Sequence, residues 1–378
     1  MSEQITKRKM LVVTTIASTI RAFLLPYIEF FREKGWEIHA LSNGVVNCEA
    51  CNAAFNKVFD VGWRRNPFAI KDTLPLISKI RNIVQANNYD IVHVHTPVAS
   101  FITRLALSRL KAQRSGFPKV VYTAHGFHFF KCRSFSENWL YLFLEKLAGK
   151  WTDALIVINR EDEETAKRFH ILPDEKIFCF SGIGLDLRYY KKSDQTESGP
   201  PNSPYFLSIG ELNPGKRHED IILAFARLSD EISAKLIIVG EGSRKDALHK
   251  LIIDEKIETK VSVFPCRQDI RALLENSIAL IMASEREGLS RIIMEAQAIG
   301  TPVIGTNARG IQELLDGGAG LIYPIGNVDT LMKHIKTISE SPEIRSTIVK
   351  KASLRIQQYE ISRIIKHHED LYQKILSV

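Results

Sequence analysis

The sequence predicts an α/β protein built from two doubly wound parallel sheets, and three observations support this. Short β-branched runs alternate with stretches of helical spacing along the 378-residue chain. A polar segment rich in serine and proline, 191–204, interrupts the alternation, which then starts again. The chain is too long for one hydrophobic core and suits two domains. Because strands that alternate with helices form parallel sheets, we expect two Rossmann-like domains joined by a linker.

Six runs in the first half are expected to be strands of one sheet: 10–17, 36–42, 89–95, 119–125, 153–159 and 175–180. Stretches of helical spacing lie between them, at 20–35, 68–87, 98–112 and 137–150. This order of elements predicts a first domain over residues 1–190, followed by the linker at 191–204.

The second half repeats the pattern. Its expected strands are 205–210, 234–240, 260–265, 279–284, 301–306 and 320–324, with helices such as 218–229 and 290–300 between them. We expect a second domain over 205–357, and a last helix within 358–378 that packs back toward the first domain. Ligands of open α/β sheets bind beyond the carboxyl ends of the strands, so a cleft between the two sheets is expected to hold the ligand.

Composition excludes several classes of protein. No apolar run approaches the roughly 20 residues needed to span a bilayer, and the first residues lack the cleavage site of a signal peptide, which predicts a cytoplasmic protein. Five cysteines over this length do not form a disulfide framework. Cys48 and Cys51 form a CxxC with neither an expected helix start after it nor a second pair, so we interpret them as incidental cysteines in a surface loop.

Basic residues are concentrated in the first half of the chain. Residues 1–150 contain 21 Lys and Arg against 10 Asp and Glu, a surplus of 11, whereas residues 191–378 contain 25 of each. No basic run interleaved with aromatic residues suggests nucleic-acid binding, so an anionic membrane surface or a lipid diphosphate is the favoured partner. A solvated basic surface without a partner remains the alternative.

The sharpest motif is 283–306, ASEREGLSRIIMEAQAIGTPVIGT. A strand is expected to end near Ser284, a tight turn at Glu287-Gly288 follows, and a helix starts around Ser290. The amides and dipole of the first helical turn can hold a phosphate. Glu287 and Glu295 can accept hydrogen bonds from hydroxyls on its two sides. The alternative is a helix capped by Ser290 with a solvated Glu295.

These residues resemble the retaining glycosyltransferases of family 4, which have the GT-B fold, through the ExxxxxxxE spacing, the EG turn and GTPVIGT. The resemblance implies that Gly288, Leu289, Ser290 and Arg291 bind the donor. The segment GELNPGKRHEDIILAF, 210–225, is similar to the first turn of the family's donor domain, with Gly210 at its start and Lys216 at the position that binds the diphosphate. Glu211 stands where the family usually has an arginine. Arg286 is the first candidate to replace that arginine, before Arg217 and Arg291.

The first half resembles the branch of that family that makes bacterial capsules and exopolysaccharides. The segments that carry the resemblance are YTAHGFHFFK at 122–131, HVHTP at 93–97, INRED at 158–162 and GIGLD at 182–186. The resemblance implies that His125 faces the donor sugar and that His128 lies nearer the acceptor. TTIASTIRAF replaces the family's frequent glycine-rich loop, so Ser18, Thr19 and Arg21 are the candidates that meet the phosphates or the acceptor.

Two further segments carry weaker signals. The resemblance implies that Gly240 and Gly242, in AKLIIVGEGSRKD, let the backbone approach the nucleotide, and that Arg267, in VFPCRQDI, borders the base. His93 and His95 share one face of a strand and, with His125 and His128, could be considered for zinc. No cysteine or carboxylate completes a recognised ligand spacing, so neither metal nor cofactor is expected.

The resemblance implies transfer of a hexose with retention of the anomeric configuration. The resemblance implies a nucleotide-sugar donor, with UDP expected, and a lipid-diphosphate-linked saccharide acceptor at the inner membrane face, for cell-surface polysaccharide. His125, Lys216 and Glu287 are the expected catalytic residues. The alternatives are a nucleotide-sugar 2-epimerase of the same shape and a non-catalytic subunit that binds a nucleotide sugar.

Overall fold

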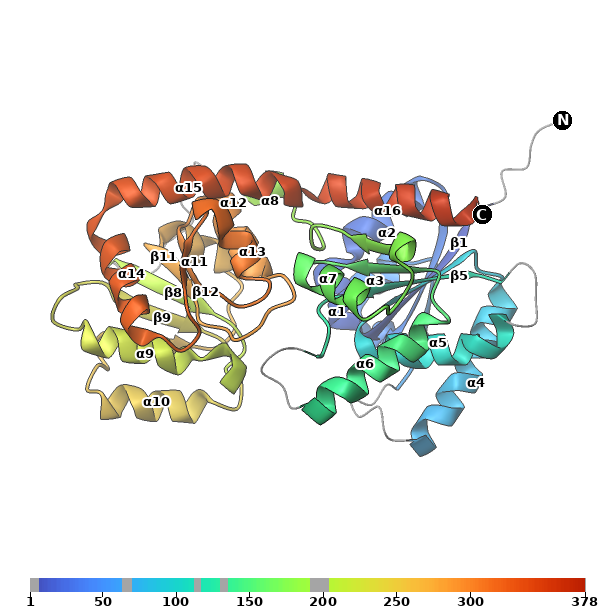
Figure 1. The fold of residues 1–378 in the computed structure, drawn as a ribbon, viewed down its shortest axis with the longest axis horizontal. Helices are drawn as coiled ribbons and strands as arrows, with labels where there is room; N and C mark the ends of the chain where they lie inside the picture. Colours follow the sequence, from blue (N-terminus) through green and yellow to red (C-terminus); the bar gives the residue numbers. More distant parts are fainter. Residues whose placement is uncertain (1–6, 63–69, 112–116, 130–134, 191–203, 378) are drawn as a thin grey trace. The chain divides into compact units, whose positions relative to one another are not determined.

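The structure is a computed structural model that describes residues 7–62, 70–111, 117–129, 135–190 and 204–377 (Figure 1). The chain divides into two compact units. Unit 1 comprises Met1–Ile183 and Ile364–Val378, and unit 2 comprises Gly184–Arg363. All of the expected linker except its last residue lies outside the described residues, and the domain boundaries expected from the sequence stay predictions.

Unit 1 contains a seven-stranded parallel sheet in the order β3-β2-β1-β4-β5-β6-β7. The strands are β1 (Lys9–Ile16), β2 (Glu37–Asn43), β3 (Lys57–Asp60), β4 (Ile91–His95), β5 (Lys119–Ala124), β6 (Ala154–Val157) and β7 (Ile177–Cys179). The expected doubly wound sheet is confirmed. β3 was not predicted, because this edge strand is short and only partly buried.

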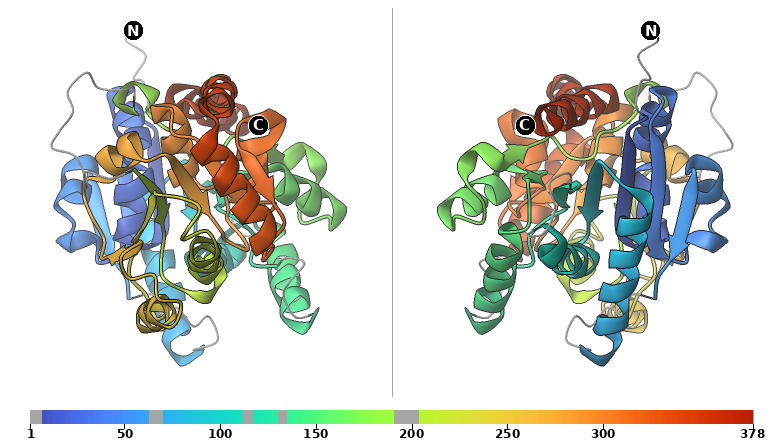
Figure 2. Two further views of the ribbon diagram at one scale, coloured as in Figure 1. Left: turned by 90° about the vertical axis from the view of Figure 1, so that its left-hand side faces the viewer. Right: turned by 90° about the vertical axis from the view of Figure 1, so that its right-hand side faces the viewer.

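Helices cover both faces of this sheet (Figure 2). Successive side chains of each strand point to opposite faces, so both faces present apolar side chains that the helices bury. One face packs against α4 (Ile70–Asn87), α5 (Pro97–Lys111) and α6 (Phe135–Gly149). Residues of the other face line a cavity together with α2 (Leu25–Glu33) and α16 (Ile361–Leu376). The other α-helices that the structure describes in this unit are α1 (Ala17–Phe23), α3 (Glu49–Ala54) and α7 (Arg160–Arg168).

The first helix differs from the expected one over 20–35. It begins at Ala17 and is divided at Leu24 into α1 and α2. Pro26 lies in the first turn of α2, where its missing N–H costs nothing, so the proline starts a new helix there.

Unit 2 contains a six-stranded parallel sheet in the order β10-β9-β8-β11-β12-β13. The strands are β8 (Tyr205–Ile209), β9 (Lys235–Val239), β10 (Val261–Phe264), β11 (Ala279–Met282), β12 (Val303–Thr306) and β13 (Leu321–Tyr323). All six match expected runs. Their buried side chains form one core with α9 (His218–Arg227), α10 (Lys245–Asp254) and α14 (Val328–Glu340), and a second core with α11 (Ile270–Asn276), α12 (Arg291–Ile299) and α13 (Gln312–Leu315).

The end of the chain packs on unit 1. α15 (Pro342–Ile356) is followed by α16, whose apolar side faces β4 and α2. Tyr372 Oη lies 2.6 Å from His93 Nδ1, and the Tyr372 ring contacts the Phe31 ring with centroids 5.2 Å apart. Lys34 of α2 forms an ion pair with Glu369 of α16. Within the described part of the chain, no helix is both long and apolar enough to cross a bilayer.

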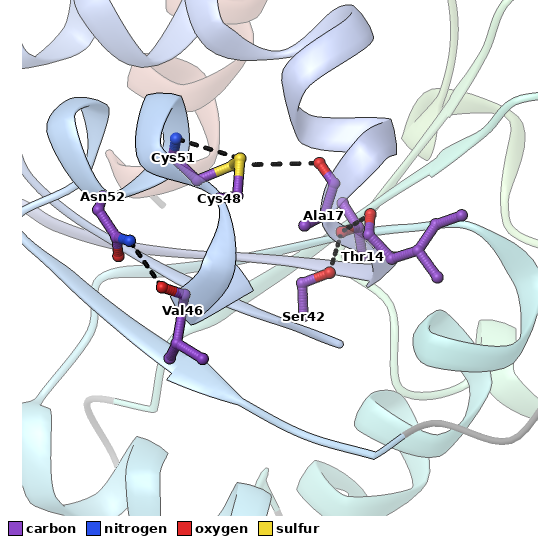
Figure 3. Close-up of a disulfide and its surroundings, with 8 residues drawn as sticks. Thr14, Ala17, Ser42, Val46, Cys48, Cys51 and Asn52 are labelled. Atoms are coloured by element: carbon purple, nitrogen blue, oxygen red, sulfur yellow. Dashed lines mark hydrogen bonds between the residues drawn. A yellow bond between two sulfur atoms is a disulfide. The ribbon is translucent and has the colours of Figure 1, made fainter. Parts of the chain in front are cut away.

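The interpretation of the CxxC as incidental loop residues is wrong. Cys48 and Cys51 form a disulfide at the start of α3, and their Cα atoms are 5.2 Å apart (Figure 3). Cys48 is the N-cap of this helix, and its Sγ accepts a hydrogen bond from the Cys51 amide at 3.3 Å. The short helix was missed because EACNAA lacks an apolar pattern of helical period. Cys51 is fully buried.

Candidate functional site

The candidate donor site lies where the strand order of unit 2 reverses, between β8 and β11. At such a point the connections leave the two strands in opposite directions, which opens a crevice at their carboxyl ends. Lys216 lies in the loop after β8 and Glu287 in the loop after β11. Lys216 Nζ is 2.5 Å from Glu287 Oε1, and the two side chains are 23% and 17% exposed. The structure therefore brings together two of the three residues expected to be catalytic.

The turn that carries Glu287 is held by the backbone of the loop after β12. The Glu287 amide donates to the Arg309 carbonyl oxygen at 3.1 Å. Gly310 has a φ of +74°, and a Cβ there would lie 2.5 Å from the Gly288 carbonyl oxygen. Only glycine permits this approach. The turn then leads to Ser290, the N-cap of α12, as the sequence predicts.

Glu295 is not solvated, so the alternative of a merely capped helix with an exposed glutamate is wrong for this side chain. Glu295 is 9% exposed, and its Oε1 accepts hydrogen bonds from Tyr190 Oη and Arg291 Nε, both at 2.8 Å. Tyr190 belongs to α8 (Leu187–Tyr190). Burial, and then the nearby Glu295 carboxylate, raise the pKa of Tyr190 to about 12, so the phenol keeps its proton and donates. Whether Glu295 binds the donor stays a prediction.

The arginine side chains around this crevice differ in their burial and in the groups that they contact. Arg217 is bound by acids on two sides, with Nε 2.7 Å from Asp220 and Nη1 3.0 Å from Glu285. Arg286 is half-buried beside Glu287. Arg309 was not predicted, yet its Nε lies 3.4 Å from the Glu287 carbonyl oxygen. Its position in the sequence could have indicated it, because Arg309 directly precedes Gly310 in the loop at the carboxyl end of the neighbouring strand β12.

Two glycines in the loop after β9, Gly240 and Gly242, lie against the backbone of the loop after β8. A Cβ on Gly240 would lie 1.9 Å from the Gly210 carbonyl oxygen, and one on Gly242 would lie 2.4 Å from the Leu212 carbonyl oxygen. Both therefore let the loops after β8 and β9 pack backbone to backbone, which is a structural reason for glycine that the family resemblance does not include. The Lys216 side chain lies over Gly210, with Cδ 3.5 Å from where a Cβ would be. Arg267 is exposed and binds Asp269 at 2.7 Å.

A buried histidine, His218, was also missed by sequence reasoning. It is the first residue of α9, and its Nδ1 lies 3.3 Å from Ser208 Oγ at the end of β8. Burial, with Lys216 as a second cause, lowers the pKa of His218 to about 4. A neutral imidazole therefore lies next to the lysine and adds no charge of its own to the crevice.

The histidine expected to face the sugar lies in unit 1, directly after β5. His125 Nε2 is 3.1 Å from His95 Nδ1, and the two rings are stacked with centroids 5.4 Å apart. Burial lowers the pKa of His125 to about 4. His128 follows three residues later, and its ring lies 5.6 Å from that of Tyr141 on α6.

The segment after His125 is fixed by a capped helix. Asn159 is the N-cap of α7 and its side chain accepts from the Asp162 amide at 2.8 Å. The Asp162 carboxylate is fully buried and accepts from the Phe127 amide at 3.3 Å. The INRED segment thus holds the HGF segment in place.

The residues expected on the acceptor side follow β1. Ser18 and Arg21 of α1 are exposed, and Thr19 is partly buried. At the same edge of the sheet, Thr15 Oγ1 lies 2.7 Å from Thr96 Oγ1, which joins the ends of β1 and β4. These strands flank the point where the order of the sheet reverses. Among the described residues, no group of three or more His, Cys, Asp or Glu side chains is arranged to hold a metal ion.

Comparison with known proteins identifies two sequence domains. Residues 13–159 match the model described as glycosyl transferase 4-like, and residues 191–355 match that of the glycosyl transferases group 1. EpsD of Bacillus subtilis, which is assigned to the glycosyltransferases, is 30% identical over 98% of both chains. The UDP-Gal:alpha-D-GlcNAc-diphosphoundecaprenol alpha-1,3-galactosyltransferase of Escherichia coli is 27% identical over 82% of this chain and 81% of its own.

Among solved structures, Anabaena HepE in complex with UDP and glucose superimposes with a TM-score of 0.80 at 20% identity, over 97% of this chain and 100% of its own. That likeness concerns the fold and agrees with the two parallel sheets described above. With matches to both domains, and a relative similar over nearly the whole length, the chain belongs to the group 1 and 4-like glycosyltransferases of the GT-B fold.

Proposed function

We propose that this glycosyltransferase moves a hexose from a UDP-sugar to a lipid-diphosphate-linked saccharide, with retention of the anomeric configuration, in the synthesis of a cell-surface polysaccharide. One observation carries the proposal above the others. Lys216 and Glu287, from the loops after β8 and β11, meet at 2.5 Å where the strand order reverses, close to the amino end of α12. A cation, a helix start and a carboxylate at one sheet edge suit a sugar diphosphate.

The chemistry requires charge stabilisation on the leaving group. As the bond to the anomeric carbon breaks, negative charge develops on the phosphate oxygens of UDP. The Lys216 ammonium and the amides of the first turn of α12 stabilise that charge. Arg286, next to Glu287 in the chain, and Arg309, whose Nε lies 3.4 Å from the Glu287 carbonyl oxygen, are the arginines that we expect to assist. These groups supply the positive field that a divalent ion otherwise provides, so we propose that transfer needs neither metal nor cofactor and proceeds in the presence of EDTA.

The other side chains have roles toward the sugar. Glu287 accepts hydrogen bonds from hexose hydroxyls, Glu295 from the hydroxyls on the other side of the diphosphate, and His125 contacts the hexose. In the proposed mechanism the acceptor hydroxyl attacks from the side of the leaving group and gives its proton to a phosphate oxygen. No side chain is then required as a general base.

The acceptor half of the proposal places the enzyme at the cytoplasmic face of the membrane. The E. coli relative named above acts on a diphosphoundecaprenol acceptor, and residues 1–150 carry the basic surplus. Trp139 and Phe143 lie one turn apart on α6, are 60% and 49% exposed, and stack with ring centroids 5.6 Å apart. Exposed aromatic rings in a part of the chain with a basic surplus suit an anionic lipid surface.

Flotation with lipid vesicles tests the proposed docking on an anionic membrane. We expect binding to vesicles that contain anionic phosphatidylglycerol, weaker binding to neutral phosphatidylcholine, and a further loss in the variant Trp139→Ser/Phe143→Ser. Equal recovery of wild type and variant with both kinds of vesicle would contradict membrane docking through α6.

A donor and acceptor screen tests the transfer itself. The purified protein is incubated with UDP-glucose, UDP-galactose, UDP-N-acetylglucosamine, UDP-N-acetylgalactosamine or GDP-mannose, together with undecaprenyl-diphosphate N-acetylglucosamine. The lipid product is detected by mass spectrometry, and its anomeric proton coupling reports retention or inversion. An epimerised donor without product would favour the 2-epimerase, and donor binding without reaction would favour a binding subunit.

A further inference from the structure

Two histidines end neighbouring strands of unit 1, and the proposed function uses only one of them. β4 ends at His95, and β5 ends directly before His125. His95 pairs with Thr123 in the sheet and is 4% exposed. Its Nδ1 lies 3.1 Å from His125 Nε2. A cavity of about 20 Å³ borders both rings. That volume accommodates about one water molecule.

The contact between His95 and His125 occupies one ring nitrogen of each histidine. A neutral imidazole carries one N–H and one lone pair, so a bond between two ring nitrogens uses the N–H of one ring and the lone pair of the other. Burial lowers the pKa of His95 well below its usual value and that of His125 to about 4. Both rings are therefore neutral near pH 7. The bond occupies His125 Nε2 and leaves Nδ1 as the ring nitrogen for a ligand.

The polar rings around His95 form hydrogen bonds of their own. Its neighbour His93 stacks with it at 4.1 Å, but both nitrogens of His93 are engaged, at 2.6 Å with Tyr372 Oη and at 2.7 Å with Thr123 Oγ1. The other polar rings that line the cavity, Tyr27 and His368, bond to the carbonyl oxygens of Ile183 and Ile364.

Backbone strain marks the same place. Thr96, directly after His95, is a β-branched residue with a φ of +63°. Thr15 holds it there, because the Thr15 amide and hydroxyl lie 3.1 and 2.7 Å from Thr96 Oγ1. Strained residues of this kind persist where the surrounding structure fixes them, and they cluster at functional sites.

We propose that His95 is a positioning residue that holds the His125 ring in one orientation, with Nε2 bonded to His95 and Nδ1 directed to the ligand. The inference rests on the proposed function for the identity of that ligand, the donor hexose. A sugar hydroxyl can donate or accept, so it can bond to Nδ1 whichever histidine carries the shared proton, as long as the ring keeps this orientation. Without His95, the His125 ring can turn over, and only part of the population fits the sugar.

The side-chain amide of asparagine provides a conservative variant. In His95→Asn the amide lies near the position of Nδ1 and can donate or accept there, whereas in His95→Gln it lies near Nε2, and His95→Leu has no polar group. We expect the transfer rate to fall roughly tenfold in the Leu and Gln variants and to stay within about threefold of wild type in the Asn variant. His39→Leu is the control for a general loss of stability in unit 1. It removes a buried histidine of β2 whose ring is hydrogen-bonded to Tyr89.

Nitrogen NMR of histidine-labelled protein gives a readout that a structural role would not change. The spectrum of His125→Ala assigns the His125 signals. In wild type and His95→Asn we expect the His125 Nε2 signal to have the shift of a hydrogen-bonded nitrogen. In His95→Leu and His95→Gln this signal should move toward the shift of an imidazole nitrogen without that bond.

Two outcomes would overturn the inference. One is a wild-type His125 pattern in the Leu and Gln variants, and the other is a rate in His95→Asn as low as in His95→Leu. If His95→Leu does not fold, the Gln variant decides. If wild type transfers no sugar from any donor, the proposed function fails, while the His125 spectra still test the contact between His95 and His125.

Discussion

The substitution Lys216→Ala should slow sugar transfer ten- to hundredfold and leave unit 2 folded. A unit charge that develops on a phosphate oxygen about 4 Å from the ammonium interacts with it by about 4 kcal/mol at an effective dielectric constant near 20. The Lys216 side chain is 23% exposed. Water that replaces it therefore recovers part of this energy, which we take as about half. The remaining ~2 kcal/mol corresponds to about a thirtyfold lower kcat.

The same substitution should have a small effect on stability. Glu287 loses its partner, but its side chain is 17% exposed and can be hydrated. A partly exposed ion pair contributes about 1 kcal/mol or less, which for a domain of this size shifts the Tm by roughly 2–4 °C. Lys336→Ala is the matched control, because Lys336 Nζ forms an ion pair with Glu231 at 2.7 Å in the same unit, with both side chains about half exposed.

The assay measures UDP release at saturating donor, so that kcat and KM are separated, alongside a thermal melt of each variant. We expect Lys336→Ala to match wild type in both. Wild-type kcat in Lys216→Ala would refute the assignment of the phosphate cation, and an equal loss in Lys336→Ala would show that the effect is not specific to the crevice.

Three other predictions follow from buried contacts. Glu295→Ala should lower the transfer rate at least tenfold, whereas Tyr190→Phe, which removes one hydrogen bond to Glu295, should lose about 1 kcal/mol of stability and stay within about threefold in rate, as measured by melts and initial rates. Arg104 is fully buried and pairs with Glu145 at 3.0 Å. Its substitution by Ala should cost about 3–5 kcal/mol in urea unfolding, and Arg104→Leu/Glu145→Leu should recover part of that. Burial lowers the pKa of His368 from 6.5 to about 4. As the pH falls, this histidine is therefore protonated in the unfolded chain at a higher pH than in the folded chain. The stability that this group contributes is complete above pH 6.5 and falls between pH 6.5 and 4. His368→Asn should flatten the slope of unfolding free energy in that window by about 1.4 kcal/mol per pH unit, and an unchanged slope would contradict the assignment.

The sheets could be predicted because each central strand is a run of apolar residues buried on both faces. IVHVH of β4 is buried throughout, and all six strands of unit 2 match expected runs. β3 and α3 could not be predicted in this way. KVFD is a short edge strand, and EACNAA forms a helix fixed by a disulfide and a cap rather than by an apolar stripe.

The candidate site could be predicted in its motifs but not in its pairings. The sequence indicated Lys216 and Glu287 separately, and the topology of unit 2 explains why residues 71 positions apart meet. It gave no sign that Arg217 is held by Glu285, or that Glu295 is bound by Tyr190 from another helix. Such contacts depend on which loops are neighbours at the sheet edge, and spacing within one segment does not contain that information.

Lys216 and Glu287 form an ion pair in the candidate site. Under the proposed function, we expect this pair to couple the two ends of the donor. The diphosphate would take the lysine and make the Glu287 carboxylate available to the hydroxyls of the hexose. A complete nucleotide sugar would then satisfy both groups, whereas UDP alone would leave the carboxylate without a sugar partner.

Glu287→Gln separates these two effects, because glutamine does not compete with the diphosphate for the ammonium charge. The variant should bind UDP several-fold more tightly in calorimetry while its transfer rate falls at least tenfold, since the neutral amide is a weaker acceptor for the sugar hydroxyls. Weaker binding of UDP would show that Glu287 orients Lys216 instead of competing for it, and the coupling of the two donor ends would then have to be abandoned.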